Sequence, residues 1–131
     1  MTAPLSESPY KSLGGLRRIF NAFRYSVLGF KAAFRCEAAF RQELALAIVM
    51  IPAAFFVGRS LIEIVLLIAV VIAVLVVELM NSAVEALADA ISLDTQPLLG
   101  RAKDIGSAAV MLSLVFAGGV WAAVLISRFW V

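Results

Sequence analysis

The chain has 131 residues, of which 63% are hydrophobic and 15% are charged, and its mean hydropathy is +1.03. Soluble globular domains hold roughly 45–50% apolar and about 25% charged residues, so this composition excludes an ordinary soluble domain and an intrinsically disordered chain. The single cysteine excludes an intrachain disulfide framework and a cysteine-based zinc site, and the absence of histidine excludes histidine-based catalysis and metal binding.

The first residues differ in character from the rest of the chain. Residues 1–13 mix Ser, Pro and other polar residues without periodicity, which predicts a mobile tail ahead of a single membrane domain at 14–131. Between about residues 16 and 35, apolar residues recur at helical spacing with Arg and Lys on the opposite side. A Phe-rich face backed by basic residues is typical of an amphipathic surface helix lying in the membrane interface. The alternative is a soluble amphipathic helix packed on a core.

Three uncharged stretches follow, at residues 44–58, 64–77 and 105–127. A transmembrane helix needs about 20 residues at roughly 1.5 Å rise each, so only the third stretch is long enough by itself. The first two become spans if their ends extend into the headgroup region. The sequence therefore predicts an all-α membrane protein with transmembrane helices at about residues 40–58, 61–88 and 102–128.

Basic residues are unevenly distributed around these spans. Seven of the eleven Lys and Arg residues lie within residues 1–43, and Arg101 and Lys103 precede the last span. The positive-inside rule then places the amino terminus in the cytoplasm, with Arg59 and Arg128 outside. An apolar chain with a basic start is typical of a protein held on anionic lipid, so we expect no nucleic-acid partner.

A polar ridge continues directly from the second span. At about 100° per residue, Glu78, Asn81, Ser82, Glu85 and Asp89 fall within one stripe of a helix. Carboxylates near the hydrocarbon are costly and usually functional, and two of them could hold a divalent cation while a third acts as a base. The ridge fits a metal-dependent membrane enzyme, or a small proton-coupled transporter in which Glu78 carries protons. The alternative, a solvated helix face, suits Asp89 well and Glu78 poorly.

Two further charged sets flank the spans. Glu37, Arg41 and Glu43 lie before the first span, and because Glu37 and Arg41 are four residues apart, a helix-stabilising ion pair is the simpler explanation for them. Arg101 and Lys103 could bind phosphate, although basic residues at that position also fit the positive-inside rule. The sequence contains no P-loop or Rossmann glycine motif, which excludes phosphate binding by either.

Three motifs occur in order along the chain. They read Glu37-Ala-Ala-Phe-Arg-Gln-Glu43, Glu78-x-x-Asn81-Ser82-Ala83-x-Glu85-x-x-x-Asp89 and Gly100-Arg101-Ala102-Lys103-Asp104-x-Gly106-Ser107-Ala108. Together they resemble the small integral-membrane diacylglycerol kinases of bacteria over about residues 16–128. The resemblance implies a homotrimer with a surface helix and three spans per subunit in the bacterial inner (cytoplasmic) membrane. It further implies ATP- and Mg²⁺-dependent phosphorylation of diacylglycerol to phosphatidic acid, a step of phospholipid biosynthesis, at the cytoplasmic interface.

The resemblance also implies roles for individual residues. Glu78 looks like the general base that accepts the lipid hydroxyl proton, and Glu37 and Glu85 look like the Mg²⁺ ligands. The implied nucleotide contacts are Arg18, Tyr25, Glu37, Glu85, Asp94, Gln96, Lys103 and Asp104. The implied lipid-substrate contacts are Glu78, Asn81, Ser107, Arg41 and Glu43. Phosphoryl transfer depends mainly on positioning and charge neutralisation, which such a set supplies without a P-loop.

The chain departs from the commoner family pattern at two places. The connector 90–97 lacks the basic residue often found after Asp89, and Cys36 stands where Asn is often found; we expect Cys36 to be a small interface residue. Undecaprenol is the alternative substrate on the same scaffold, because both lipids present a primary hydroxyl at headgroup level. The basic, Phe-rich first helix resembles the diacylglycerol branch more closely.

Overall fold

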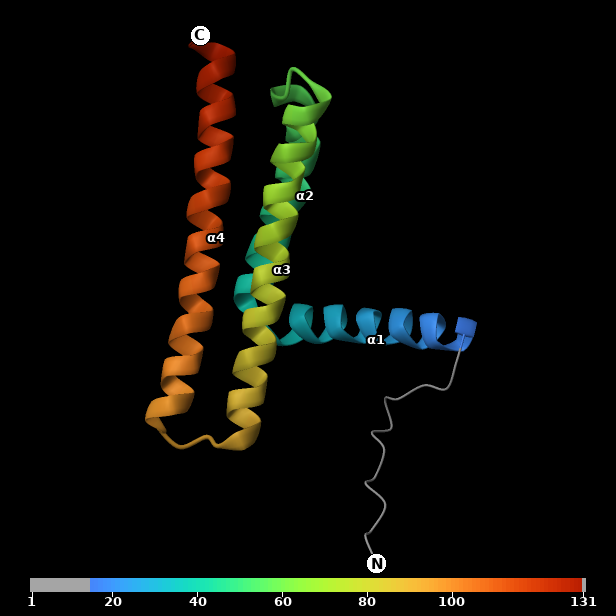
Figure 1. Ribbon diagram of the computed structural model, residues 1–131, viewed down its shortest axis with the longest axis vertical. Helices are drawn as coiled ribbons and strands as arrows, with labels where there is room; N and C mark the ends of the chain where they lie inside the picture. The colour runs from blue at the N-terminus through green and yellow to red at the C-terminus, as the bar shows by residue number, and fades with distance from the viewer. Residues whose placement is uncertain (1–14, 131) are drawn as a thin grey trace, which may run out of the picture.

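The computed structural model describes residues 15–130, and within that range it contains four helices and no strand. The helices are α1 (Gly15–Cys36), α2 (Ala38–Val57), α3 (Leu61–Ile91) and α4 (Pro97–Phe129). The last three helices run along the long axis of the molecule, and α1 runs crosswise to them, leaving them partway along α3 (Figure 1). The predicted all-α fold is confirmed, and the tail predicted at residues 1–13 lies outside the described residues.

Helices α2, α3 and α4 are each long and apolar enough to cross a membrane. Three long apolar helices are therefore present where the spans were predicted, and α3 and α4 extend beyond the predicted span bounds. Helix α4 begins at Pro97 rather than near 102, and α3 continues to Ile91 rather than ending near 88. The prediction ended each span close to charged residues, but the residues just beyond include the good helix formers Ala90, Leu98 and Leu99, so the helices continue. Proline suits the first turn, because the missing N–H has no intrahelical partner there.

A single non-helical residue separates α1 from α2. Glu37 has extended backbone angles, φ −106° and ψ 114°. Just beyond it, Arg41 Nη1 donates hydrogen bonds to the carbonyl oxygens of Phe34 at 3.0 Å and Arg35 at 3.3 Å. These bonds satisfy carbonyls at the end of α1 that have no intrahelical donor. Within residues 15–130 no ion pair joins Glu37 to Arg41, because the break in the helix takes the two side chains out of helical register.

The turn between α2 and α3 is tight and tied to α4. A Cβ on Gly58 would lie 2.6 Å from the Ile64 side chain, so only glycine fits there. Ser60 Oγ accepts from the Glu63 amide at 3.2 Å, and Glu63 Oε2 accepts from the Arg59 amide at 2.7 Å, which caps the start of α3. The Arg59 guanidinium donates to the Ser127 hydroxyl at 2.7 Å and to the Ser127 carbonyl. All three long helices are therefore linked at this end.

The packed core lies between α3 and its two neighbours, α2 and α4. The buried residues of this core are Ala47, Ala54, Leu67, Val70, Val71, Val74, Ala117 and Trp121. The Trp121 indole N–H donates to the Leu67 carbonyl at 3.3 Å, so the one polar group of this large side chain is satisfied. Large apolar side chains remain exposed on the outer faces of the helices, which is the arrangement expected of helices that face lipid.

Candidate active site

The polar ridge on α3 passes from buried to exposed along the helix. Glu78 is 3% exposed and Ser82 is 9% exposed, whereas Asp89, further along the same face, is exposed. In Figure 1 the end of α3 and the start of α4 continue past the level of α1, away from the α2–α3 turn. The ridge therefore starts inside the helix bundle and ends at the connector between α3 and α4.

Acidic side chains from two elements surround Glu78. Glu78 interacts electrostatically with Glu37, at the start of α2, and with Glu85, two turns further along α3. Glu43 on α2 also interacts with Glu78. Like charges at short range repel one another, and this repulsion makes the region a favourable place for a cation or a proton.

Asn81 holds the orientation of Glu85. Its Nδ2 donates to Glu85 Oε1 at 3.0 Å. The Asn81 Oδ1 lies against Gly106 of α4, at a place where a Cβ on that glycine would collide with it. Because residue 106 has no side chain, α4 approaches α3 closely enough to cover Asn81. Gly106 therefore helps to position Asn81, and through it Glu85, a predicted metal ligand.

Three buried side-chain oxygens in this region have no hydrogen-bond partner within residues 15–130: Glu43 Oε2, Asn81 Oδ1 and Ser82 Oγ. Buried polar atoms in proteins are almost always hydrogen-bonded, because leaving one unpaired costs about 1–3 kcal/mol. Three such atoms around the α3 ridge indicate that this region can accept further polar groups.

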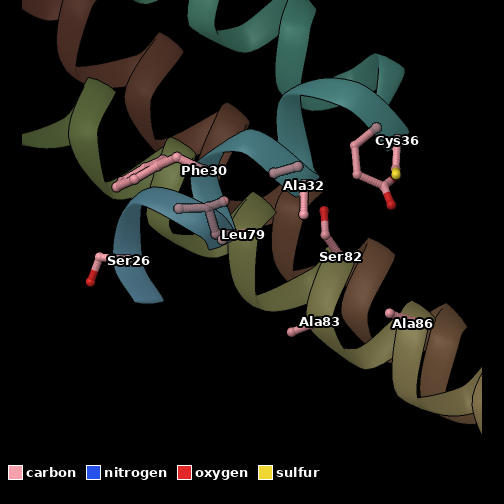
Figure 2. Close-up of a pocket in the computed structure, with 11 residues that line it drawn as sticks. Ser26, Phe30, Ala32, Cys36, Leu79, Ser82, Ala83 and Ala86 are labelled. Carbon is pink, nitrogen blue, oxygen red and sulfur yellow. The ribbon is translucent and has the colours of Figure 1, made fainter. Parts of the chain in front are cut away.

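A cavity of about 500 Å³ lies between α1 and α3, and we refer to it as the α1–α3 pocket. Its wall is mainly apolar, with Phe30 and Leu79 at one end, and Glu37 and Ser82 supply polar groups. Figure 2 shows the Ser82 hydroxyl directed toward α1, on the same side of the pocket as Cys36. An apolar cavity with a few polar groups is the usual form of a small-molecule site.

A second cavity, of about 390 Å³, is formed by the connector between α3 and α4. Asp89, Asp94, Gln96 and Lys103 line this connector pocket. Lys103 Nζ lies 2.5 Å from Asp89 Oδ1, and this ion pair closes the base of the helical hairpin. The Lys103 ammonium group lines this pocket, and such a group can form charge-assisted hydrogen bonds with a phosphate.

The structure thus brings together part of the predicted site. Glu37 joins the α3 ridge across the α1–α3 pocket, and the predicted nucleotide contacts Asp94, Gln96 and Lys103 share the connector pocket. The remaining predicted nucleotide and substrate contacts on α1 and α4 are exposed and line neither of these two pockets: Arg18, Tyr25, Asp104 and Ser107.

Three features of the site are absent from the sequence-based prediction. It missed the ion pair between Lys103 and Asp89, although a connector of only a few residues signals that these positions face each other. The positioning role of Gly106 had no signal in the sequence, because it depends on how closely α4 approaches α3. The third feature is the pair of hydrogen bonds from Arg41, a predicted substrate contact, to carbonyls at the end of α1.

Within residues 15–130 no three Cys, Asp or Glu side chains lie close enough to hold a metal ion by themselves. This fits Mg²⁺, which is usually held by one or two carboxylates together with phosphate oxygens and water. Glu37 and Glu85 each interact electrostatically with Glu78, and Asn81 orients Glu85, so these are the two carboxylates that a metal ion could use here. The donor set therefore suits a magnesium ion that arrives with a nucleotide.

Comparison with known proteins identifies the family. The profile of the prokaryotic diacylglycerol kinases matches residues 24–125, which include the α1–α3 pocket, the α3 ridge and the connector pocket. The chain belongs to this family. It is 50% identical over 122 residues to the diacylglycerol kinase of Pseudomonas aeruginosa, covering 93% of this chain and 99% of the relative.

Two further diacylglycerol kinases are similar over almost their whole length. The relative from Haemophilus influenzae is 47% identical over 116 residues, covering 88% of this chain and 98% of its own. The relative from Escherichia coli K12 is 43% identical over 115 residues, covering 88% and 94%. The resemblance drawn from the three motifs is therefore confirmed for the family of prokaryotic diacylglycerol kinases.

Proposed function

We propose that this protein is a lipid kinase that transfers the γ-phosphoryl group of ATP, with Mg²⁺, to the free hydroxyl of diacylglycerol. The observation that carries the proposal is the buried Glu78 carboxylate, which lies among Glu37 and Glu85 beside an apolar pocket. A base, two acidic residues and a mainly apolar cavity beside one long apolar helix are parts that this reaction needs. Membership of the diacylglycerol kinase family supports the same substrate.

In this proposal the α1–α3 pocket takes the lipid. Its apolar wall suits the glycerol backbone and the first part of the acyl chains, and Ser82 Oγ is an unpaired buried group that can hydrogen-bond the headgroup. Asn81, Glu43 and Ser107 extend the polar side of the substrate site. The lipid hydroxyl then lies close to Glu78, and the acyl chains remain in the apolar layer of the membrane.

The nucleotide binds on the connector side. Lys103 exchanges part of its interaction with Asp89 for the phosphates, and Asp94 and Gln96 contact the nucleoside end. Arg18, Tyr25 and Asp104 complete the nucleotide site from α1 and α4. The two carboxylates of Glu37 and Glu85 would hold Mg²⁺, which supplies charge neutralisation on the phosphate oxygens.

The lipid hydroxyl gains the phosphoryl group and loses its proton in the same step. The lipid hydroxyl oxygen attacks the γ-phosphorus and the bond to the β-phosphate oxygen breaks, leaving ADP. The Glu78 carboxylate accepts the hydroxyl proton as the new O–P bond forms. The products are phosphatidic acid and ADP. Burial of Glu78 excludes the water that would otherwise compete for the phosphoryl group.

We place the protein in the bacterial inner membrane with its amino terminus and α3–α4 connector in the cytoplasm, because the basic residues concentrate there. Helix α1 then lies along the membrane surface and α2, α3 and α4 cross the bilayer. We propose that three chains assemble, so that exposed site residues such as Asp104 and Ser107 become covered by a neighbouring subunit.

A direct assay tests the proposal. The purified full-length protein is incubated with radiolabelled ATP and Mg²⁺ in mixed micelles that contain diacylglycerol, undecaprenol or neither. We expect label to enter phosphatidic acid, and Glu63→Gln, a change at the opposite end of α3, to leave the rate unchanged. Labelling of undecaprenol alone would contradict the proposed substrate, and no labelling of either lipid would contradict a lipid kinase.

A further inference from the structure

A third cavity, of about 620 Å³, lies on the opposite face of α1 from the α1–α3 pocket. At about 100° per residue, Lys31, Phe34 and Arg35 point away from Ala33 and Cys36, which line the α1–α3 pocket. The wall of this cavity, which we call the α1–α2 groove, is apolar and consists of Phe30, Phe34, Phe40, Leu44 and Leu75. Neither the α3 ridge nor the connector contributes a residue to it.

Two cations stand at the rim of the α1–α2 groove. Lys31 and Arg35 are one helical turn apart on α1, and both are exposed. No acidic residue lines the groove, and within residues 15–130 neither side chain takes part in an ion pair. Lys103, by contrast, is paired with Asp89. The groove therefore combines an apolar interior with two uncompensated positive charges at one edge.

The geometry of the groove is held by contacts between α1 and α2. The rings of Phe30 and Phe40 are 6.5 Å apart between centroids and tilted by 36°. Phe40 is 2% exposed, so it anchors this contact in the bundle. Arg41 bonds to the carbonyls of Phe34 and Arg35 and fixes the last turn of α1 over the groove. The cavity is therefore part of the folded subunit.

We propose that the α1–α2 groove is a binding site for one anionic phospholipid that remains bound and is not phosphorylated. The phosphate of the lipid lies between Lys31 and Arg35, and one acyl chain follows Leu44 and Leu75 along the spans. A soluble anion would use the two cations but not the apolar wall. A neutral lipid would use the wall but not the cations. Only an amphiphile with a negative headgroup uses both.

Charge separates this site from the proposed substrate site on the other face of α1. Glu37 lines the α1–α3 pocket, and with Glu78 and Glu85 close to it, that pocket disfavours a negatively charged headgroup. The α1–α2 groove has the opposite charge. The two faces of helix α1 therefore bind lipids of different headgroup charge: a neutral lipid in the α1–α3 pocket and an anionic lipid in the α1–α2 groove.

The test measures lipid binding and needs no turnover, so it is independent of the proposed kinase activity. Delipidated full-length protein is titrated by native mass spectrometry with phosphatidylglycerol, phosphatidylcholine or inorganic phosphate. The decisive variant is Lys31→Gln/Arg35→Gln. Its matched control is Arg17→Gln/Arg24→Gln, which removes the same charge from α1 away from the groove. We expect the first variant to weaken phosphatidylglycerol binding about 30-fold, because it removes both cations that line the groove. We expect the control to weaken binding less than about 3-fold, because Arg17 and Arg24 do not line the groove.

A second variant tests the apolar part. Leu44→Trp fills the groove and leaves both cations in place, and we expect it to abolish tight binding of phosphatidylglycerol. Equal losses of phosphatidylglycerol affinity in the two double variants would show that the lipid is attracted to the basic helix as a whole. That result would overturn the proposed site. Binding of phosphate or phosphatidylcholine as tightly as phosphatidylglycerol would overturn the assigned ligand. A change of subunit number in Leu44→Trp with unchanged lipid binding would show that a second copy of the chain fills the groove, and would also overturn the proposal.

Discussion

Within residues 15–130, Glu78 is the only acidic residue that is buried. Its side chain is 3% exposed and lies close to other carboxylates, so it lowers the stability of the fold. Ionisable residues in such places usually have a function. Glu78→Gln keeps the shape and removes the base. We expect lipid phosphorylation to fall by about 10²–10⁴-fold, the usual contribution of general-base catalysis, while ATP binding changes little. Steady-state rates and equilibrium nucleotide binding on the same preparation measure the two effects. Near wild-type phosphorylation by Glu78→Gln would exclude it as the base.

Glu37 and Glu85 are expected to act on the same ion. Glu37→Gln and Glu85→Gln should each raise the Mg²⁺ concentration needed for half-maximal activity. The double variant should lose less than the product of the two single losses, because the second change acts on an ion already displaced. The measurement is a Mg²⁺ titration of activity for the four proteins. Unchanged Mg²⁺ dependence in both single variants would contradict a metal-binding role for Glu37 and Glu85. Glu37 would then have only a structural role at the break between α1 and α2.

At the residue scale, helical periodicity predicted the α3 ridge because a period of 3.6 residues is a local property of the chain. The position of Glu78 at the end of the second span already argued against a solvated side chain. The burial of Ser82 was not predictable in the same way, since it depends on helices that approach from elsewhere. The same reason explains Arg41. Its spacing from Glu37 suggested an ion pair, and the helix break at Glu37 gave it two carbonyls to cap instead.

Close contact between α3 and α4 depends on Gly106. Gly106→Ala would bring a Cβ into Asn81, so either the helices separate or Asn81 rotates away from Glu85. We expect a loss of stability of about 1–3 kcal/mol, typical of overpacking, and a higher Mg²⁺ requirement. The control is Gly119→Ala, whose new Cβ meets nothing within 4 Å and which should be neutral or slightly stabilising. Thermal unfolding in detergent and the Mg²⁺ titration measure both effects, and identical behaviour of the two variants would contradict the positioning role.

The elements themselves were largely predictable. Hydrophobicity and length identify α2, α3 and α4, because a membrane span requires a long apolar run. Their ends were less accurate, as Pro97 shows: charge marks where a helix leaves the apolar layer, and the helix continues beyond that point. The crosswise course of α1 was not predictable from its own periodicity, since amphipathic spacing is the same for a surface helix and for a core helix (Figure 1).

Large apolar side chains are exposed on all four helices, and the predicted site residues Asp104 and Ser107 on α4 are uncovered. A trimer would cover them. We expect native mass spectrometry in mild detergent to give three times the 14.0 kDa chain mass. Mixing inactive Glu78→Gln chains with inactive Asp104→Asn chains should restore activity if neighbouring subunits share sites. A monomer, or no restored activity from mixed chains, would contradict shared sites.

Cys36 gives this protein a built-in reporter. It is the only cysteine of the sequence, it is exposed, and it lines the α1–α3 pocket beside Ser82 (Figure 2). A thiol-reactive fluorophore therefore labels the unmutated chain at one known position, at the wall of the proposed lipid site. Diacylglycerol should slow labelling by maleimide, and phosphatidylglycerol, bound across α1, should not. Lipid binding in the α1–α3 pocket can then be followed by fluorescence in a bilayer, without any substitution in the chain.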